Sequence, residues 1–246
     1  MFRGMMFVSV VVLWSFEICW AQDPNQNKTQ TDQIALFQTF FEDAPIAADF
    51  YWEGFFQYLE FSGGISAFDL AAQGAFPVGP QTQIGGAWAF RNISPGSNGI
   101  TDLVVSGRHN ILQVPATISV GALLTLPIGS EDIGQSNFNF SGFGALRYPL
   151  LSGQVLTGAL GLEFIEQGGN REAGLMLAGG VIVPAATDLH LIGEINIRSR
   201  IDYALLTGGV DYVLPGVGGK LRGAIGIGLD DAAPDFGLRA GYFLGF

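Results

Sequence analysis

The sequence is poor in charge, and after its first twenty residues it has no apolar run long enough for a membrane-spanning helix. Charged residues make up 13% of the 246 residues, hydrophobic residues make up 48%, and glycine occurs 36 times. This composition is too apolar for an ordinary soluble enzyme. A spanning helix needs about 20 consecutive apolar residues. The low charge content and the lack of a long apolar run both favour a membrane β-barrel, in which each strand exposes only every second side chain to lipid.

Cysteine is equally scarce. Cys19 lies in an N-terminal segment with one basic residue, Arg3, and an apolar core at Met5–Phe16. This arrangement predicts a secretory signal peptide over residues 1–21, cleaved after Ala21. A lipoprotein signal is the weaker alternative, because Ile18 directly before the cysteine is not small. Cleavage would leave a mature chain without a thiol, which excludes disulfides.

The net charge of −11 argues against nucleic acid or an anionic membrane surface as a partner. The two histidines, His109 and His190, have no second histidine or cysteine at ligand spacing, so we predict no metal and no cofactor. Some twelve-stranded barrels are lipases with a Ser-His pair on the outer face. His109 has lipid-side parity but Ser106 has lumen parity, so we predict no catalytic residue.

From about Phe50 onward the sequence alternates with period two, and twelve strand-like segments repeat every 16 residues or so. In 138–148, for example, Phe138 and Leu146 share one parity whereas Ser141 and Arg147 share the other. The prediction is an all-β, membrane-spanning, antiparallel up-and-down β-barrel of about twelve strands over residues 49–246. Ten or fourteen strands remain alternatives, because the first strand has an ambiguous pattern.

Charged side chains decide which face is the lumen. Most basic residues of the predicted mature chain fall on one parity, and a lysine or arginine facing lipid at mid-bilayer would cost about 2–4 kcal/mol. We favour the interpretation that these charges pair across strands and fill the barrel; the alternative is that they line a conducting path. The predicted pore-lining residues are Asp69, Arg91, Asp102, Arg108, Arg147, Glu163, His190, Glu194, Arg198, Lys220, Arg222 and Arg239.

The connections alternate between tight turns, such as Val78–Gln81, and more polar loops at 94–99, 130–137, 167–172 and 230–235. An even strand number places both termini at the end with the tight turns, which is the periplasmic side in bacterial barrels. The outer loops are too short to form a lid.

Residues 22–48 differ from the rest and are predicted to be a flexible periplasmic extension. Ile34, Phe37, Phe40 and Phe41 have the spacing of a short amphipathic helix. This segment could plug the barrel, cap its periplasmic mouth, or have no specific role, and we favour the last interpretation.

The last strand ends on an aromatic residue, and its alternate positions are apolar: Tyr242, Leu244 and Phe246. It resembles the C-terminal signal of outer-membrane proteins. That resemblance implies recognition by the barrel-assembly machinery and localisation in the outer membrane of a Gram-negative bacterium, with membrane lipid as a further partner.

One internal stretch resembles a named family. Residues 124–130, LTLPIGS, followed by a short polar loop and a new strand, are similar to the strand end of the outer-membrane family of the MetA pathway of phenol degradation. Members of that family are barrels often described as transporters. The resemblance implies a passage for small, apolar or aromatic molecules and identifies no binding residue.

The function predicted from these features is a porin-like channel or facilitated-uptake pore for small solutes, and not an enzyme. The first alternative is a structural or plugged barrel without transport. The second is an outer-membrane enzyme of the lipase type.

Overall fold

The structure, a computed structural model, describes residues 34–38, 40–46, 49–151, 153–167, 169–216 and 218–245. The predicted signal peptide and the tail as far as Gln33 lie outside these residues. Within the described chain, no helix is both long and apolar enough to span a membrane. The regular structure there consists of strands and one 3-10 turn, η2 (Ser199–Ile201).

The strands follow one another in the order β1 (Tyr51–Phe61), β2 (Ile65–Gly79), β3 (Thr82–Ser94), β4 (Asn98–Ile100), β5 (Leu103–Leu112), β6 (Thr117–Leu126), β7 (Asn139–Pro149), β8 (Val155–Gln167), β9 (Asn170–Ala186), β10 (Leu189–Arg198), β11 (Tyr203–Val213), β12 (Lys220–Gly228) and β13 (Phe236–Gly245).

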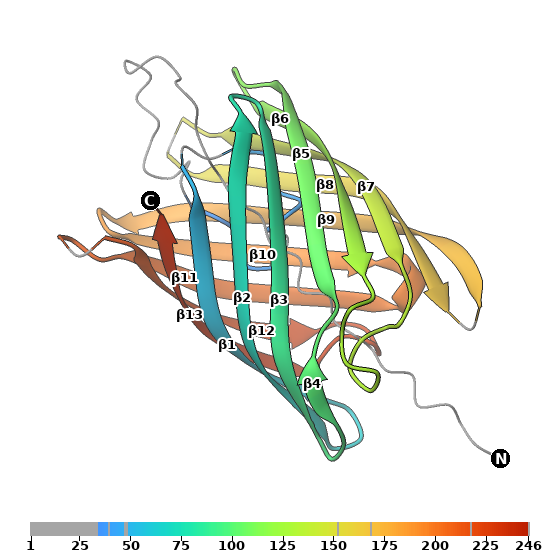
Figure 1. The fold of residues 1–246 in the computed structure, drawn as a ribbon. Helices are drawn as coiled ribbons and strands as arrows, with labels where there is room; N and C mark the ends of the chain where they lie inside the picture. The colour runs from blue at the N-terminus through green and yellow to red at the C-terminus, as the bar shows by residue number, and fades with distance from the viewer. Residues whose placement is uncertain are drawn as a thin grey trace.

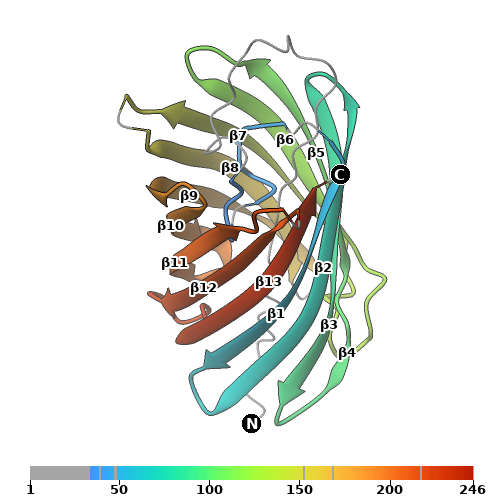
Figure 2. The same ribbon diagram turned by 90° about the vertical axis from the view of Figure 1, so that its left-hand side faces the viewer.

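The sheet closes on itself because β1 pairs with both β2 and β13 (Figures 1 and 2). Phe56, for example, lies opposite Leu70 on one side and Ala240 on the other. Every pairing is antiparallel between strands that are neighbours in sequence, apart from the closing pair and the short β4, which lies beside β3. The fold is therefore a closed antiparallel barrel of twelve strands with one extra strand, which confirms the predicted architecture.

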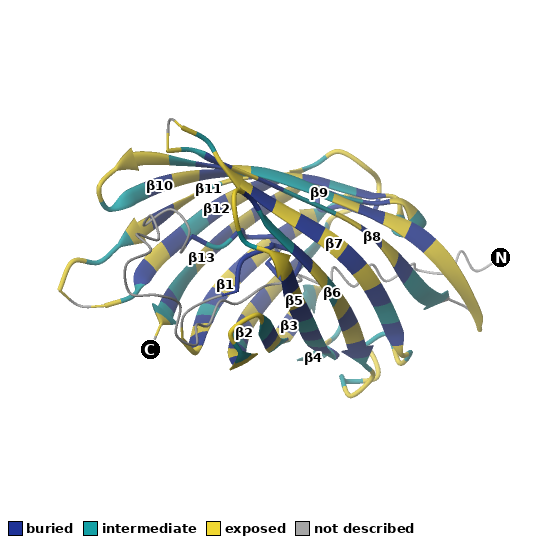
Figure 3. Ribbon diagram, turned by 90° about the horizontal axis from the view of Figure 1, so that it is seen from above, coloured by how far each residue is buried: buried dark blue, intermediate teal, exposed yellow. Residues whose placement is uncertain are grey.

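Buried and exposed residues alternate along the strands, and Figure 3 shows this as bands across the wall. In β1, Glu53 and Phe55 are buried, whereas Trp52 and Phe56 face outward. This pattern resolves the ambiguity of the first strand. The outward positions carry large apolar side chains in most strands, which is the surface expected of a wall that faces lipid.

Most connections are short, and one predicted loop is shorter than expected. Residues 167–172 were expected to form a polar loop, but β8 continues to Gln167 and β9 begins at Asn170. Glu166 and Arg171 are register partners, and their side chains form an ion pair of 3.1 Å. The predicted extent was wrong because polar residues at the ends of a long strand pair were taken to belong to the loop.

The described part of the N-terminal extension, residues 34–38 and 40–46, lies inside the barrel and is called the plug segment (Figures 1 and 2). It forms bends instead of the expected helix. Its apolar residues pack against different parts of the barrel wall. Phe37 packs in a cluster with Ile182 and Ile192, whereas Phe40 and Phe41 pack in a second cluster.

Candidate functional site

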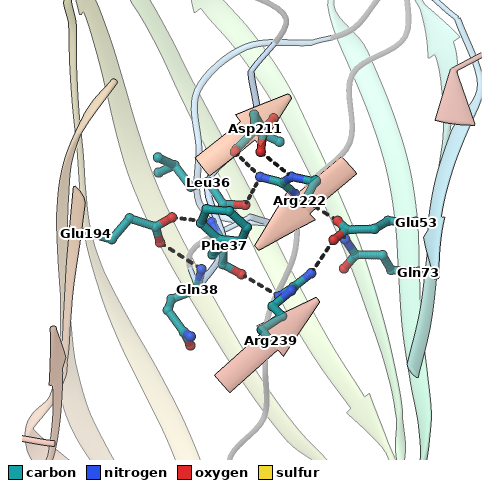
Figure 4. Close-up of polar contacts among 10 residues, drawn as sticks. Leu36, Phe37, Gln38, Glu53, Gln73, Glu194, Asp211, Arg222 and Arg239 are labelled. Carbon is teal, nitrogen blue, oxygen red and sulfur yellow. Dashed lines mark hydrogen bonds and ion pairs between the residues drawn. The ribbon is translucent and has the colours of Figure 1, made fainter. Parts of the chain in front are cut away.

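One side of the lumen has arginines that pair with acids of the wall itself. On β1, β2, β11, β12 and β13, which we call the paired wall, Arg222 binds Asp211 at 2.7 Å and Glu53 at 2.8 Å. Arg239 binds the other oxygen of Glu53 at 2.5 Å, and the Gln73 amide donates to Glu53 at 2.7 Å (Figure 4). These groups are almost completely buried. Buried charges need such partners, because an isolated one is costly.

Arg91 on β3 forms a separate pair with an acid of the neighbouring β2. Its guanidinium donates two hydrogen bonds, of 2.7 and 2.6 Å, to the two oxygens of Asp69. The two residues are register partners on adjacent strands. The geometry is the bidentate one that gives the strongest arginine-carboxylate pairs. On this side of the lumen the charged side chains pair across strands, as the favoured interpretation of the sequence expects.

The opposite side of the lumen differs. Strands β5, β6 and β7, which we call the acid-free wall, contain no aspartate or glutamate in any position. They nevertheless direct Arg108 and Arg147 into the lumen, where both are buried. The guanidinium groups of these arginines make hydrogen bonds to the plug segment.

Asp43 of the plug segment receives the central contacts. Its Oδ2 lies 3.1 Å from Nη1 of Arg147, and its Oδ1 accepts a hydrogen bond of 3.0 Å from the hydroxyl of Thr157. Arg147 also donates to the carbonyl of Ile34 at 2.7 Å. Arg147 and Thr157 are register partners on β7 and β8, so two adjacent wall positions hold one carboxylate.

Further donors of the same wall bind plug carbonyls. Arg108 donates to the carbonyl of Asp43, and the Ser119 hydroxyl donates to the carbonyl of Ala44. Arg108 also contacts the Gln83 side chain at 3.4 Å. The irregular backbone of the plug segment therefore finds in the wall the partners that a helix would have supplied internally.

Strand β10 binds the plug segment through one acidic and one basic side chain. Glu194 accepts hydrogen bonds from the backbone amides of Phe37 and Gln38, the latter at 2.7 Å (Figure 4). Arg198 binds Glu42 at 3.0 Å. Both oxygens of the Glu194 carboxylate therefore point to the plug segment.

Aromatic and apolar contacts also hold the plug segment against the barrel wall. Phe40 contacts Tyr51 edge-to-face, with ring centroids 5.9 Å apart. The Arg222 guanidinium lies 4.3 Å from the ring centroid of Phe37, a cation–π contact. Gly209 leaves room for Phe37, because a Cβ there would lie 2.4 Å from its Cε2. The plug segment thus touches β1 and several strands from β5 to β13.

All twelve residues predicted to line the pore are buried, between 2% and 9% exposed. Asp102 has a local role, because its carboxylate accepts hydrogen bonds from the backbone amides of Gly129 and Gln135 and so shapes the β6–β7 loop. Lys220 lies over the ring of Phe243 at 4.9 Å. Ten of the twelve have a role described above; Glu163 pairs with Arg198 at 3.1 Å, and His190 is buried at the start of β10.

Four acidic residues of the site were missed. Glu53 and Asp211 lie at inward positions of β1 and β11, and the alternation of these strands carried the signal that would have placed them there. Glu42 and Asp43 belong to a segment without the period-two alternation of the strands, so no pattern indicated that they enter the lumen.

The residues considered for catalysis lie apart. His109 faces outward, where its Nδ1 is 2.8 Å from the Thr82 hydroxyl, whereas Ser106 is buried on the inner face. Among the described residues, no group of three histidine, cysteine, aspartate or glutamate side chains is arranged to hold a metal. Of the residues predicted to form an assembly signal, Tyr242 and Leu244 lie on β13 opposite Gly54 and Trp52, and Phe246 is outside the described residues.

Comparison with known proteins gives no match to a family model and none to a curated protein. Solved structures match in fold. An outer-membrane channel from Pseudomonas putida F1 has a TM-score of 0.63 at 10% identity, covering 83% of this chain and 98% of that one. The NanC porin has a TM-score of 0.57 at 10% identity, covering 80% of this chain and 99% of that one. The KdgM porin in complex with disordered oligogalacturonate has a TM-score of 0.54 at 13% identity, covering 79% and 99%.

These likenesses establish the fold: the chain has the architecture of outer-membrane barrel channels. They do not confirm the MetA-pathway family, and at such low identity they carry no residue roles.

Proposed function

We propose that this protein is a gated channel for small solutes in the bacterial outer membrane, and that the plug segment is its gate. One observation carries the proposal. Two buried arginines of the acid-free wall, Arg108 and Arg147, bind a segment that is not part of the barrel. A segment held by hydrogen bonds and ion pairs can leave without breaking the sheet, whereas a lumen closed by its own wall cannot open.

The proposed location in the outer membrane rests on other features of the chain. The outward apolar side chains, the fold shared with outer-membrane channels, and the predicted assembly signal at Tyr242, Leu244 and Phe246 all support insertion in the outer membrane. The predicted pore-lining residues would then border the path that opens when the plug segment leaves. Rings of the plug segment pack on apolar wall residues, which favours solutes with an apolar or aromatic part.

The test is conductance in planar lipid bilayers. We expect low conductance from the unmodified protein and larger, longer openings from the double variant Glu42→Gln/Asp43→Asn, which keeps the shape of the plug segment but removes its two charges. The matched control is Glu131→Gln/Asp132→Asn, which removes two adjacent acids from an exposed loop. This control should behave like the unmodified protein.

The alternative is a plugged barrel without transport, and the extent of buried contact around the plug segment is the observation that favours it. In that case the double variant would remain as silent as the unmodified protein even after the plug segment has been shown to leave the lumen.

A further inference from the structure

We infer that the acid-free wall is a binding site for small carboxylate anions, aromatic ones above all, and that the plug segment occupies this site with its own carboxylate. The inference deepens the proposed channel function and rests on it for the route by which a solute reaches the site.

The first argument is charge balance. Arg222 and Arg239 on the paired wall bind acids of the barrel, which stay in place whatever the plug segment does. The acid-free wall has Arg108 and Arg147 but no acid on its three strands, and the carboxylate that Arg147 binds there comes from Asp43. Departure of the plug segment removes this counter-charge. A partly enclosed arginine then favours an anion from solution in its place.

The second argument is geometry. Arg147 on β7 and Thr157 on β8, the strand next to the acid-free wall, are register partners, and each binds a different oxygen of the same carboxylate. Both donors belong to the rigid barrel, so they remain at this spacing when Asp43 is gone. Two fixed donors, one for each oxygen, form a two-point site for a carboxylate, whereas a neutral amide presents only one acceptor oxygen.

The third argument concerns what lies beside the carboxylate. Phe40 and Phe41 precede the two acids of the plug segment and pack in one cluster with Phe143, Phe55 and Tyr51. Phe143 is four residues from Arg147 on β7, with the same inward parity. The wall therefore offers an apolar, aromatic surface on the same strand as its cation. A molecule with an aromatic ring and a carboxylate, such as benzoate, has both complementary parts.

The direct test is calorimetric titration of the purified Glu42→Gln/Asp43→Asn protein with benzoate and with benzamide, its neutral analogue of similar shape. We expect benzoate to bind at least about tenfold more tightly than benzamide. Adding Arg147→Gln should abolish the difference, and adding Arg171→Gln, which alters an exposed ion pair, should preserve it. Equal binding of both compounds, or binding of neither, would overturn the inference.

A second measurement uses the full chain with an intact plug segment. Ala44 is completely buried, so Ala44→Cys reports release of the plug segment through its rate of reaction with a water-soluble thiol reagent; the unmodified protein is the blank. Benzoate that competes with Asp43 should accelerate labelling about tenfold, and benzamide should not. An identical labelling rate with both compounds contradicts the inference even if the double variant fails to fold.

Conductance separates the two proposals. If the double variant binds benzoate with the stated preference but does not conduct, the carboxylate site is supported and the channel function is wrong. If it conducts but does not distinguish benzoate from benzamide, the channel function is supported and the carboxylate site is wrong.

Discussion

On the paired wall, Arg222 lies between Glu53 and Asp211, both of which belong to the barrel. On the acid-free wall, Arg147 binds Asp43, which belongs to the plug segment. Both arginines are buried and face the same lumen, but their ion pairs connect different parts of the chain. The ion pairs of Arg222 join strand to strand, and its guanidinium also donates to the Ala35 and Leu36 carbonyls of the plug segment. The ion pair of Arg147 joins the barrel to the plug segment.

Substitution of a buried arginine is therefore expected to have different effects on the two walls. A change on the paired wall acts mainly on the folded barrel, because it leaves wall acids buried without their cation, although Arg222 and Arg239 also donate to carbonyls of the plug segment. A change on the acid-free wall acts on the docking of the plug segment, because Asp43 can move into water when its partner is removed. Burial alone would not have distinguished these cases.

The largest effect is expected for Arg222→Met. The substitution leaves Asp211 without this partner and Glu53 with one arginine fewer, and removal of one member of a buried pair typically costs about 3–5 kcal/mol. The midpoint of urea unfolding, followed by tryptophan fluorescence in detergent, should fall accordingly. Arg171→Met, at an exposed pair with Glu166, should cost no more than about 1 kcal/mol. A similar loss in both variants would contradict the role assigned to the paired wall.

Arg147→Met should show most clearly that the acid-free wall acts on docking of the plug segment and not on stability of the barrel. Loss of its contacts to Asp43 and Ile34 should weaken docking of the plug segment by about 2 kcal/mol, because hydrogen bonds to charged groups contribute about this much. Labelling of Ala44→Cys should then accelerate roughly 30-fold, with little change in the urea midpoint. A large fall in that midpoint without faster labelling would show that Arg147 supports the barrel itself.

The wall of the barrel could be predicted from sequence because alternation is a local signal. Each strand records in its own residues which side faces lipid, so Arg147, Arg198 and Arg222 were placed inward without knowledge of their neighbours. The long β8–β9 pair was the exception, since polar residues beyond the membrane region look like a loop.

The plug segment could not be predicted in the same way. The spacing of Ile34, Phe37, Phe40 and Phe41 fits a helix, but the lumen presents apolar surfaces on several sides and separate donors for the backbone. Tertiary contacts therefore override the local preference. The partner of Arg147 lies 104 residues away in the chain, a separation that no local pattern encodes.

Glycine at the inner wall provides the next test of plug docking. A Cβ at Gly209 would lie 2.4 Å from Phe37 and 2.7 Å from the carbonyl of Gly223. Gly209→Ala should therefore cost about 1–3 kcal/mol, shared between displacement of the plug segment and a shift of the strand. Its neighbour Gly208 has open space around the same position, so Gly208→Ala should leave Ala44→Cys labelling unchanged. Equal labelling in both variants would mean that Phe37 adjusts without loss of docking.

The smallest effect is expected for Thr157→Val, which is nearly isosteric. It removes one hydroxyl donor to Asp43 while the carboxylate keeps Arg147, so docking should weaken by about 1 kcal/mol. Ala44→Cys labelling should accelerate roughly fivefold. Thr207→Val is the matched control, because the Thr207 hydroxyl is buried and has no hydrogen-bond partner among the described residues. If the two variants label at the same rate, the Thr157 hydroxyl does not help to hold the carboxylate, and Arg147 alone would account for binding at this wall.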